Sequence, residues 1–155
     1  MATGPSVRVE NVTVRNTSGV CIYLGGTDAI ATNNIASGCA YGVAVMSNGN
    51  TIAQNQFNDN MFDGILVTGD ANLLEGNEVL RNGGVGIHVV RMVPMIGDDQ
   101  FIPLIQDRAT GNVIRGNRAL SNNVDLEEFG TCDYPGLMNE WTDNSFETGR
   151  PDCVR

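Results

Sequence analysis

The chain contains no lysine and a single histidine, and charge of either sign is scarce: only 17% of its 155 residues are charged, and all nine basic residues are arginine. Eighteen acidic residues give a formal net charge of −9, so the sequence lacks the basic surface that nucleic acids and anionic lipids require. No run approaches the ~18–20 consecutive apolar residues of a membrane span. We therefore expect neither a nucleic-acid nor a membrane partner.

The N-terminus also lacks the basic and apolar stretches of a signal peptide. What the sequence has instead is 18 asparagines and 19 glycines, a composition that disfavours helices and favours turns. With 41% apolar residues at regular spacing, the chain can still bury a core. Its length suits a single domain over residues 1–155.

Asparagine recurs at intervals of 22 residues, and this repeat is the most informative feature of the sequence. The register continues through an insertion of 18 residues and through a final unit that is five residues longer. Three columns follow it: Asn33, Asn55, Asn77, Asn117 and Asn144; Asp28, Asn50, Asn72, Asn112 and Asn139; and Gly38, Asn60, Asn82 and Asn122. Three columns that stay in register through two insertions of different length indicate a structural repeat.

Apolar residues follow the same register and alternate with polar ones inside short runs, which is typical of β-strands. The columns are Ile30, Ile52, Leu74, Ile114 and Trp141; Ile35, Phe57, Val79, Ala119 and Phe146; Val43, Ile65 and Ile87; and Val45, Val67 and Val89, with Val20 and Ile22 extending the last two backwards. Because such a short unit cannot bury its apolar side alone, we expect equivalent strands to stack ~4.8 Å apart.

This stacking predicts a single-stranded parallel β-helix of about six coils, with apolar stacks inside and asparagine ladders at the corners. Asparagine suits a corner because it tolerates a left-handed backbone and its amide can bond to the asparagines above and below. The same register predicts ion pairs between neighbouring coils at Glu75–Arg115, Glu78–Arg118 and Asp59–Arg81.

The segment Asn-Gln-Phe-Asn-Asp-Asn-Met-Phe-Asp-Gly-Ile-Leu-Val (55–67) and its equivalents, over roughly residues 7–146, resemble right-handed parallel β-helix repeats of the pectate-lyase-like superfamily. More narrowly, the chain is similar to secreted bacterial proteins of the NosD-like type. The resemblance implies a right-handed solenoid. It does not imply one activity, because lyases, hydrolases, epimerases, tailspikes and binding proteins share this scaffold.

The expected organisation is a stack of coils over residues 7–122, interrupted by an insertion at 91–108, with the last coil and a C-terminal cap at 123–155. The repeat begins by Val7 without the amphipathic helix that usually covers the first coil in this superfamily. A solenoid needs such a cover, because an open end exposes unpaired strand edges. We therefore expect either a longer chain, of which this is the C-terminal part, or a homodimer through the N-terminal coil.

Four cysteines allow three full pairings. Cys132 and Cys153 flank the last unit, so we expect a disulfide there that closes the cap. We expect Cys21 and Cys39 to be free thiols, because their offset within the coil keeps them apart. One disulfide implies an oxidising compartment, and we expect a secreted or cell-envelope location with any signal peptide outside this sequence.

Catalytic candidates are few. His88 is expected to face outward beside the insertion, with Ala44 and Leu66 as column neighbours, neither of them acidic. Charged partners could reach it only from the insertion, which contains Arg91, Asp98, Asp99, Asp107 and Arg108, and the catalytic candidates are His88, Arg91, Asp98 and Asp99. Cysteine and histidine spacings that bind metals are missing, and the Gly-rich turns lack the nonapeptide repeat of calcium-binding solenoids. We therefore expect no cofactor or metal.

The leading functional hypothesis is a secreted module that binds or processes an extracellular polysaccharide. An alternative is a non-catalytic assembly segment that self-associates through its N-terminal coil. A weaker alternative is a polysaccharide lyase or uronate epimerase that uses His88 and the insertion.

Overall fold

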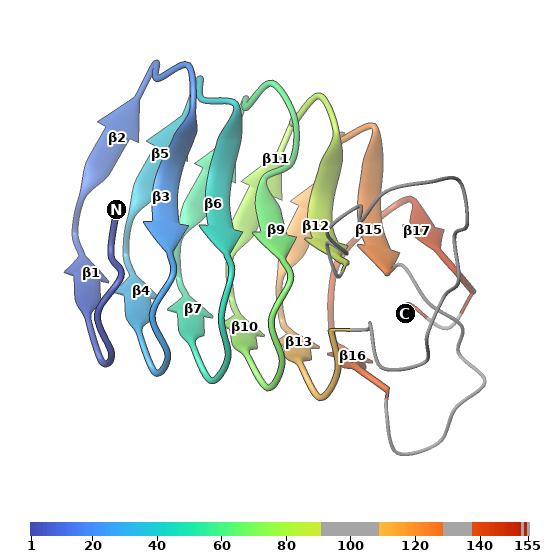
Figure 1. Cartoon of the computed structure of the whole chain (residues 1–155). Helices are drawn as coiled ribbons and strands as arrows, with labels where there is room; N and C mark the ends of the chain where they lie inside the picture. The colour runs from blue at the N-terminus through green and yellow to red at the C-terminus, as the bar shows by residue number, and fades with distance from the viewer. Residues whose placement is uncertain (91–108, 129–137, 153, 155) are drawn as a thin grey trace, which may run out of the picture.

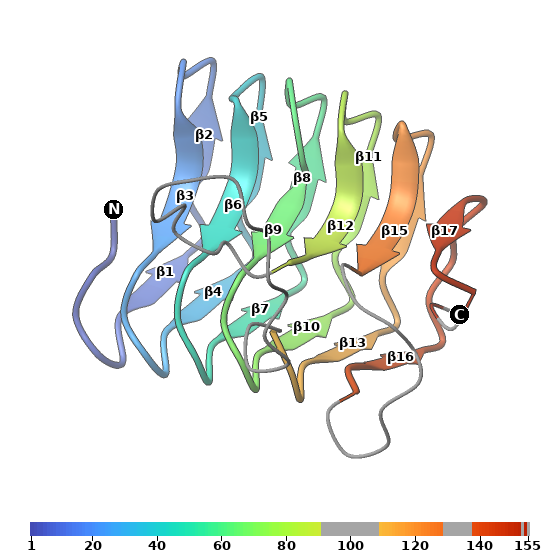
Figure 2. The ribbon, with the colours of Figure 1, turned by 45° about the vertical axis from the view of Figure 1, so that its right-hand side comes forward.

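The computed structural model describes residues 1–90, 109–128, 138–152 and 154, and all regular structure in these residues is β-strand. The strands are short, and each pairs in parallel with its equivalent on the next coil, which gives three sheets around one core (Figures 1 and 2). Residues paired across neighbouring coils are 21 or 22 apart over the first four coils, as in Leu73↔Thr51 and Ala31↔Ile52. The fold confirms the predicted parallel β-helix with asparagine ladders.

The strands divide among the sheets as follows. The first sheet contains β1 (Arg8–Glu10), β4 (Ile30–Thr32), β7 (Thr51–Ala53), β10 (Leu73–Glu75), β13 (Val113–Arg115) and β16 (Glu140–Thr142). The second contains β2 (Thr13–Arg15), β5 (Ile35–Ser37), β8 (Gln56–Asn58), β11 (Glu78–Leu80) and β14 (Arg118–Leu120). The third contains β3 (Val20–Leu24), β6 (Tyr41–Val45), β9 (Ile65–Val67), β12 (Val85–Val89), β15 (Val124–Glu128) and β17 (Gly149–Arg150).

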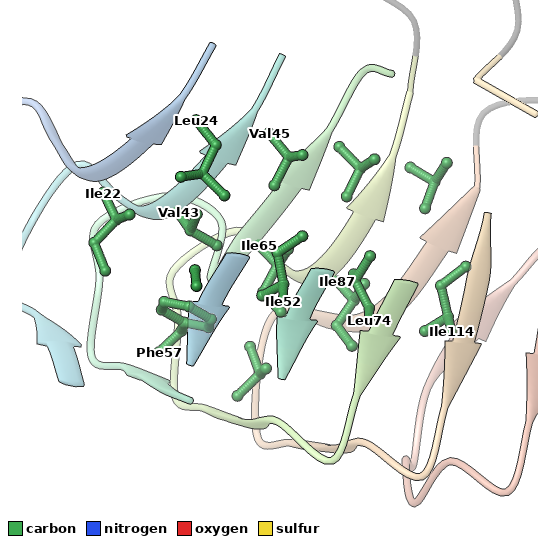
Figure 3. Close-up of a cluster of buried hydrophobic side chains, with 14 of the residues drawn as sticks. Ile22, Leu24, Val43, Val45, Ile52, Phe57, Ile65, Leu74, Ile87 and Ile114 are labelled. Atoms are coloured by element: carbon green, nitrogen blue, oxygen red, sulfur yellow. The ribbon is translucent and has the colours of Figure 1, made fainter. Parts of the chain in front are cut away.

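The interior is filled by one apolar side chain from the middle of each strand of the first two sheets and by two from most strands of the third (Figure 3). From the third coil onward these columns are the ones that the repeat predicts. In the first two coils they differ: Ala31 and Ala36 face inward rather than Ile30 and Ile35. Likewise Ile22 and Leu24, not Val20 and Ile22, precede Val43 and Val45. The reason is that the second coil is one residue shorter than the coils on either side of it, with Ala31 opposite Ile52.

Each corner of the solenoid holds a ladder of buried asparagines. An asparagine donates from Nδ2 to Oδ1 of its equivalent on the next coil, and the same oxygen accepts its backbone N–H, at 2.8–3.1 Å. The ladders are Asn34, Asn55, Asn77, Asn117 and Asn144; Asn50, Asn72, Asn112 and Asn139; and Asn60, Asn82 and Asn122.

Besides Gly38, whose place before Asn60 is taken by Cys39, two predicted members are not in the ladders. Asn33 is exposed, and the neighbouring Asn34 takes its place. Asp28 is also exposed, and Ala29 occupies the ladder position before Asn50 in its place. Ala29 donates its backbone N–H to Asn50 Oδ1. Both corrections follow from the short second coil.

The left-handed backbone at the corners belongs to the residue before each ladder asparagine, not to the asparagine itself. Asn33, with φ of 57°, precedes Asn34, and Arg81, with φ of 54°, precedes Asn82. The left-handed residue turns the chain and leaves its side chain outside. The asparagine that follows can then point its amide inward along the ladder.

Glycine precedes the inward isoleucine or valine of the third sheet because there is no room for a Cβ. At Gly64 a Cβ would collide with the Val79 side chain and lie 2.7 Å from the Asn82 amide nitrogen. At Gly86 it would lie 2.7 Å from the Asn122 amide nitrogen. The glycine and asparagine columns are therefore in contact along the corner.

Cys21 and Cys39 form a disulfide, with their Cα atoms 5.7 Å apart, so the prediction that both are free thiols is wrong. Cys39 occupies the ladder position before Asn60, to which it donates its backbone N–H at 3.1 Å. Cys21 lies in the column of Gly42, because its neighbours pair with those of Gly42. The disulfide thus replaces the glycine–asparagine contact in this part of the stack. The predicted partners Cys132 and Cys153 lie outside the described residues, and that pairing stays a prediction.

The third ladder ends on a buried carboxylate. Asp125 Oδ1 accepts the backbone N–H and the amide of Asn122, both at 3.0 Å. Its Oδ2 accepts the backbone N–H groups of Glu147 and Thr148, also at 3.0 Å. Burial works to raise the pKa of Asp125, but these donated hydrogen bonds outweigh it and hold the pKa below its ordinary value.

Candidate functional site

The corner between the second and third sheets runs along the top of the ribbon in Figures 1 and 2. Residues at this corner line a groove. It has a volume of about 550 Å³, and four successive coils contribute to it. We call it the corner groove; it is lined by Thr17, Ser18, Gly38, Cys39, Ala40, Asp59, Asn60, Met61, Arg81 and Gly83. Because neighbouring coils are ~4.8 Å apart, a site that crosses several of them suits an extended ligand.

An ion pair between two coils lies in the corner groove. Arg81 donates from Nε to Asp59 Oδ1 at 2.8 Å and from Nη2 to Asp59 Oδ2 at 2.7 Å, and this bidentate contact confirms the predicted pair. The hydrogen bond from Arg81 lowers the pKa of Asp59, and the carboxylate in turn raises the pKa of Arg81. Both residues have a left-handed backbone, which directs their side chains outward on adjacent coils.

Apolar and aromatic side chains border the groove. Met61 is 69% exposed, and Phe62, which follows it in the chain, is 46% exposed. The Phe62 ring packs against Tyr41 with 5.3 Å between ring centroids. Tyr41 in turn follows the groove residue Ala40, so the aromatic pair continues the groove toward the third sheet.

Directly after Phe62, Asp63 forms a contact with the one histidine of the chain. Asp63 Oδ2 lies 3.0 Å from His88 Nδ1, and its other oxygen accepts the Val85 backbone N–H at 2.8 Å. A carboxylate only accepts hydrogen bonds, so His88 must carry a proton on Nδ1. In the neutral ring Nε2 is then the basic nitrogen, and about a fifth of the side chain (22%) is exposed.

The expectation that His88 has no acidic partner outside the insertion is therefore wrong. Its strand neighbours are Leu66 on one side, as predicted, and Glu127 on the other. Asp63 lies before the strand, at the corner, and reaches His88 diagonally across coils. A search restricted to residues directly opposite one another does not find such a contact.

A family model described as right handed beta helix region matches residues 1–150. The chain belongs to this family. Comparisons with curated proteins and with solved structures gave no significant match. Membership establishes the scaffold, whereas the activity depends on the side chains that this right-handed β-helix carries on its outside.

On the outer face of the third sheet, the β-helix carries a row of ionisable groups beyond His88. Glu127 is opposite His88 on the next coil and forms a bidentate pair with Arg150, at 2.7 and 3.0 Å. This pairing raises the pKa of Arg150. Asp63, His88, Glu127 and Arg150 thus follow one another along the solenoid.

The remaining candidates from the sequence, Arg91, Asp98 and Asp99, lie outside the described residues. Among the residues that the structure describes, no group of three or more histidine, cysteine or acidic side chains could hold a metal ion. No helix in the same part of the chain is long and apolar enough to cross a membrane. The disulfide is consistent with an extracytoplasmic location.

Proposed function

We propose that this β-helix protein is a secreted or cell-envelope module that binds an extracellular polysaccharide along the corner groove. The observation that carries the proposal is the Phe62–Tyr41 pair, in which Phe62 is exposed and Tyr41 is partly buried, beside a groove that crosses four coils. Ligand sites combine apolar and aromatic surface with a few oriented polar groups, and the groove supplies both.

The geometry suits a polymer better than a small molecule. The groove crosses four successive coils, so its lining extends along the solenoid axis. A chain of sugars laid along this axis could contact the hydroxyl groups of Thr17 and Ser18 at one end and the Asp59–Arg81 pair at the other. The exposed ring of Phe62 offers an apolar face to the C–H groups of a sugar, while neighbouring side chains offer hydrogen bonds.

The test is binding of the purified protein to a panel of polysaccharides by affinity electrophoresis. We expect retardation by at least one polymer, and a loss of roughly 10-fold in affinity for Phe62→Ala, the size expected for a buried aromatic contact at a binding site. Phe62→Tyr keeps the ring and should bind normally. Failure of the wild-type protein to bind any polysaccharide, or equal binding by Phe62→Ala, would contradict the proposal.

A second candidate is chemical processing of the bound polymer, which the Asp63–His88 contact favours. A histidine oriented by a carboxylate is a suitable general base. His88 contacts Asp63, and Asp63 directly follows Phe62 of the aromatic pair in the chain. A lyase or epimerase reaction would require a uronate substrate. Release of new reducing ends or of unsaturated sugars by the wild-type protein, but not by His88→Ala, would support processing.

A third candidate is self-association, as a homodimer through the N-terminal coil. Strands β1, β2 and β3 are the terminal strands of the three sheets, and residues 2–6 pair with only part of this end through hydrogen bonds such as Ala2 N–H to Tyr23 O at 2.9 Å. Exposed strand edges can pair with a second copy. A molecular mass that doubles with concentration in analytical ultracentrifugation would support a dimer, and a constant monomer mass would exclude it.

A further inference from the structure

We infer that the polymer bound in the corner groove is an uncharged polysaccharide, whose hydroxyl groups are bound by the Asp59–Arg81 pair. This inference rests on the proposed function and specifies its ligand class. It is carried by the charge of the groove and by the geometry of this one ion pair.

The groove has no net charge to offer an acidic polymer. Among the described residues that line it, Asp59 and Arg81 are the only charged ones, and they neutralise each other. The whole chain carries a formal net charge of −9, so its field repels polyanions at a distance. A uronate carboxylate placed at Arg81 would also meet the carboxylate of Asp59.

Hydroxyl groups fit the pair without this conflict. Arg81 uses Nε and Nη2 for Asp59, and a guanidinium has five N–H donors in all, so it can donate to further oxygens. Each carboxylate oxygen of Asp59 likewise has a second lone pair with which to accept a hydroxyl proton. Neighbouring hydroxyls on one sugar both donate and accept, and the charged partners strengthen each of these hydrogen bonds.

The pair is held in place by the backbone on both sides. Asp59 and Arg81 turn their corners with φ of 57° and 54°, and the ladder residues Asn60 and Asn82 follow them directly. About half of each charged side chain is exposed, 54% for Asp59 and 55% for Arg81. The donors and acceptors therefore face the groove from a rigid frame and need little ordering when a ligand binds.

The chain contains a matched control. Arg115 pairs with Glu75 at 2.9 Å across two coils of the first sheet, with similar exposure, but neither residue lines the groove. Both pairs are at the surface and contribute little to folding stability. Asp59→Asn and Arg81→Gln can therefore be compared with Glu75→Gln and Arg115→Gln, after thermal unfolding has shown that all four variants are folded.

The test is isothermal titration of the wild-type protein and these variants with soluble neutral polymers (dextran, xyloglucan, galactomannan) and acidic ones (polygalacturonate, alginate, hyaluronate). We expect binding to a neutral polymer that changes by less than about twofold between low salt and ~0.5 M salt, where surface charge is screened. Asp59→Asn and Arg81→Gln should each lose roughly 10-fold in affinity, as expected for hydrogen bonds to charged groups. Glu75→Gln and Arg115→Gln should bind as the wild type does.

Salt-sensitive binding to acidic polymers alone would overturn the inference while leaving polysaccharide binding intact, and would favour the uronate-processing alternative. Neutral-polymer binding that is equally strong in Asp59→Asn and Arg81→Gln would also overturn it. Failure to bind any polymer of either class would overturn the proposed function itself and the inference with it.

Discussion

At the scale of the residue, buried asparagine amides connect each coil to the next. The Asn77 side chain accepts the backbone N–H of Asn55 at 3.0 Å and donates to the carbonyl of Ile52 at 2.8 Å and to Asn117 Oδ1 at 2.9 Å. None of these groups is accessible to water, so each needs a protein partner. In the described residues no buried side-chain nitrogen or oxygen lacks one.

We predict that Asn77→Ala lowers the free energy of unfolding by about 2–4 kcal/mol, because it leaves the Asn55 N–H and the Ile52 carbonyl unsatisfied in the interior. Asn33→Gly is the control, since Asn33 is exposed and its φ of 57° suits glycine. It should change stability by less than about 0.5 kcal/mol. Urea unfolding measures both. A ladder variant no less stable than the control would show that the ladder contributes little.

Asp125 predicts how stability depends on pH. Its pKa in the folded protein is below the ordinary value of 3.8. Its contribution to stability is therefore fully present above 3.8, and it is lost as the pH falls through the lower folded-state pKa. Asp125→Asn should cost about 2–4 kcal/mol at neutral pH, because an amide NH₂ would face N–H donors.

Urea unfolding of both proteins between about pH 6 and pH 2.5 tests this. The stability difference between wild type and Asp125→Asn should shrink over the acid part of that range, since the other carboxylates are common to both. A difference that stays constant at every pH would show that the Asp125 carboxylate is not the cause.

At the scale of the element, the ladder asparagines and the inward residues of the first two sheets could be predicted from the third coil onward, but those of the first two coils could not. In the third sheet the predicted columns stop at Val89, so Leu126 and the ladder-ending Asp125 were not predicted. Three asparagine columns with a constant spacing determine the register wherever the coils have equal length. The second coil lacks asparagine at two of its three ladder positions, where Ala29 and Cys39 stand. Without asparagines at these positions, the sequence does not reveal that the coil is one residue shorter. The predicted register of this coil was therefore off by one residue, so Ile30 and Ile35 were assigned to the core and Asn33 to a ladder.

The same shift concealed the disulfide. Once the shorter coil is allowed for, Cys21 falls in the glycine column and Cys39 in the asparagine column, which are in contact on the following coils. Which cysteines pair is therefore determined by how the coils align with one another, and not by the number of residues between the cysteines. His88 was found from the sequence, whereas its partner Asp63 was not, because corner side chains are not confined to one column.

We predict that the Cys21–Cys39 disulfide and a glycine–asparagine contact are interchangeable in this coil. Reduction should destabilise the wild-type protein by up to about 3 kcal/mol, the chain-entropy estimate for a loop of 18 residues. The double variant Cys21→Gly/Cys39→Asn should fold, and reductant should lower its thermal midpoint less than that of the wild type, because a Cys132–Cys153 disulfide would be common to both proteins.

The single variants Cys21→Ser and Cys39→Ser provide the comparison, since each removes the disulfide without supplying the replacement pair. Differential scanning calorimetry with and without reductant should place the double variant above both. A double variant no more stable than the single ones would contradict the equivalence of the two contacts.

At the scale of the whole molecule, the solenoid repeats the same backbone corner on successive coils, but each coil carries different outer side chains there. The first four coils contribute Thr17, Cys39, Asp59 and Arg81 to the same groove, and the exposed Phe62 directly follows the groove residue Met61 in the chain. The ladder asparagines hold these corners in register, so the outer side chains form a continuous surface. We propose that a polymer binds along that surface.

The most direct measurement is a two-dimensional ¹⁵N NMR titration of the 16.6 kDa chain with an oligosaccharide of whichever neutral polymer binds. We predict that chemical-shift changes concentrate on the amides of residues 38–40, 59–63 and 81–84, with the first sheet around Glu75 and Arg115 unchanged. Changes centred on the first sheet or on the N-terminal coil, with the groove amides unmoved, would contradict the claim.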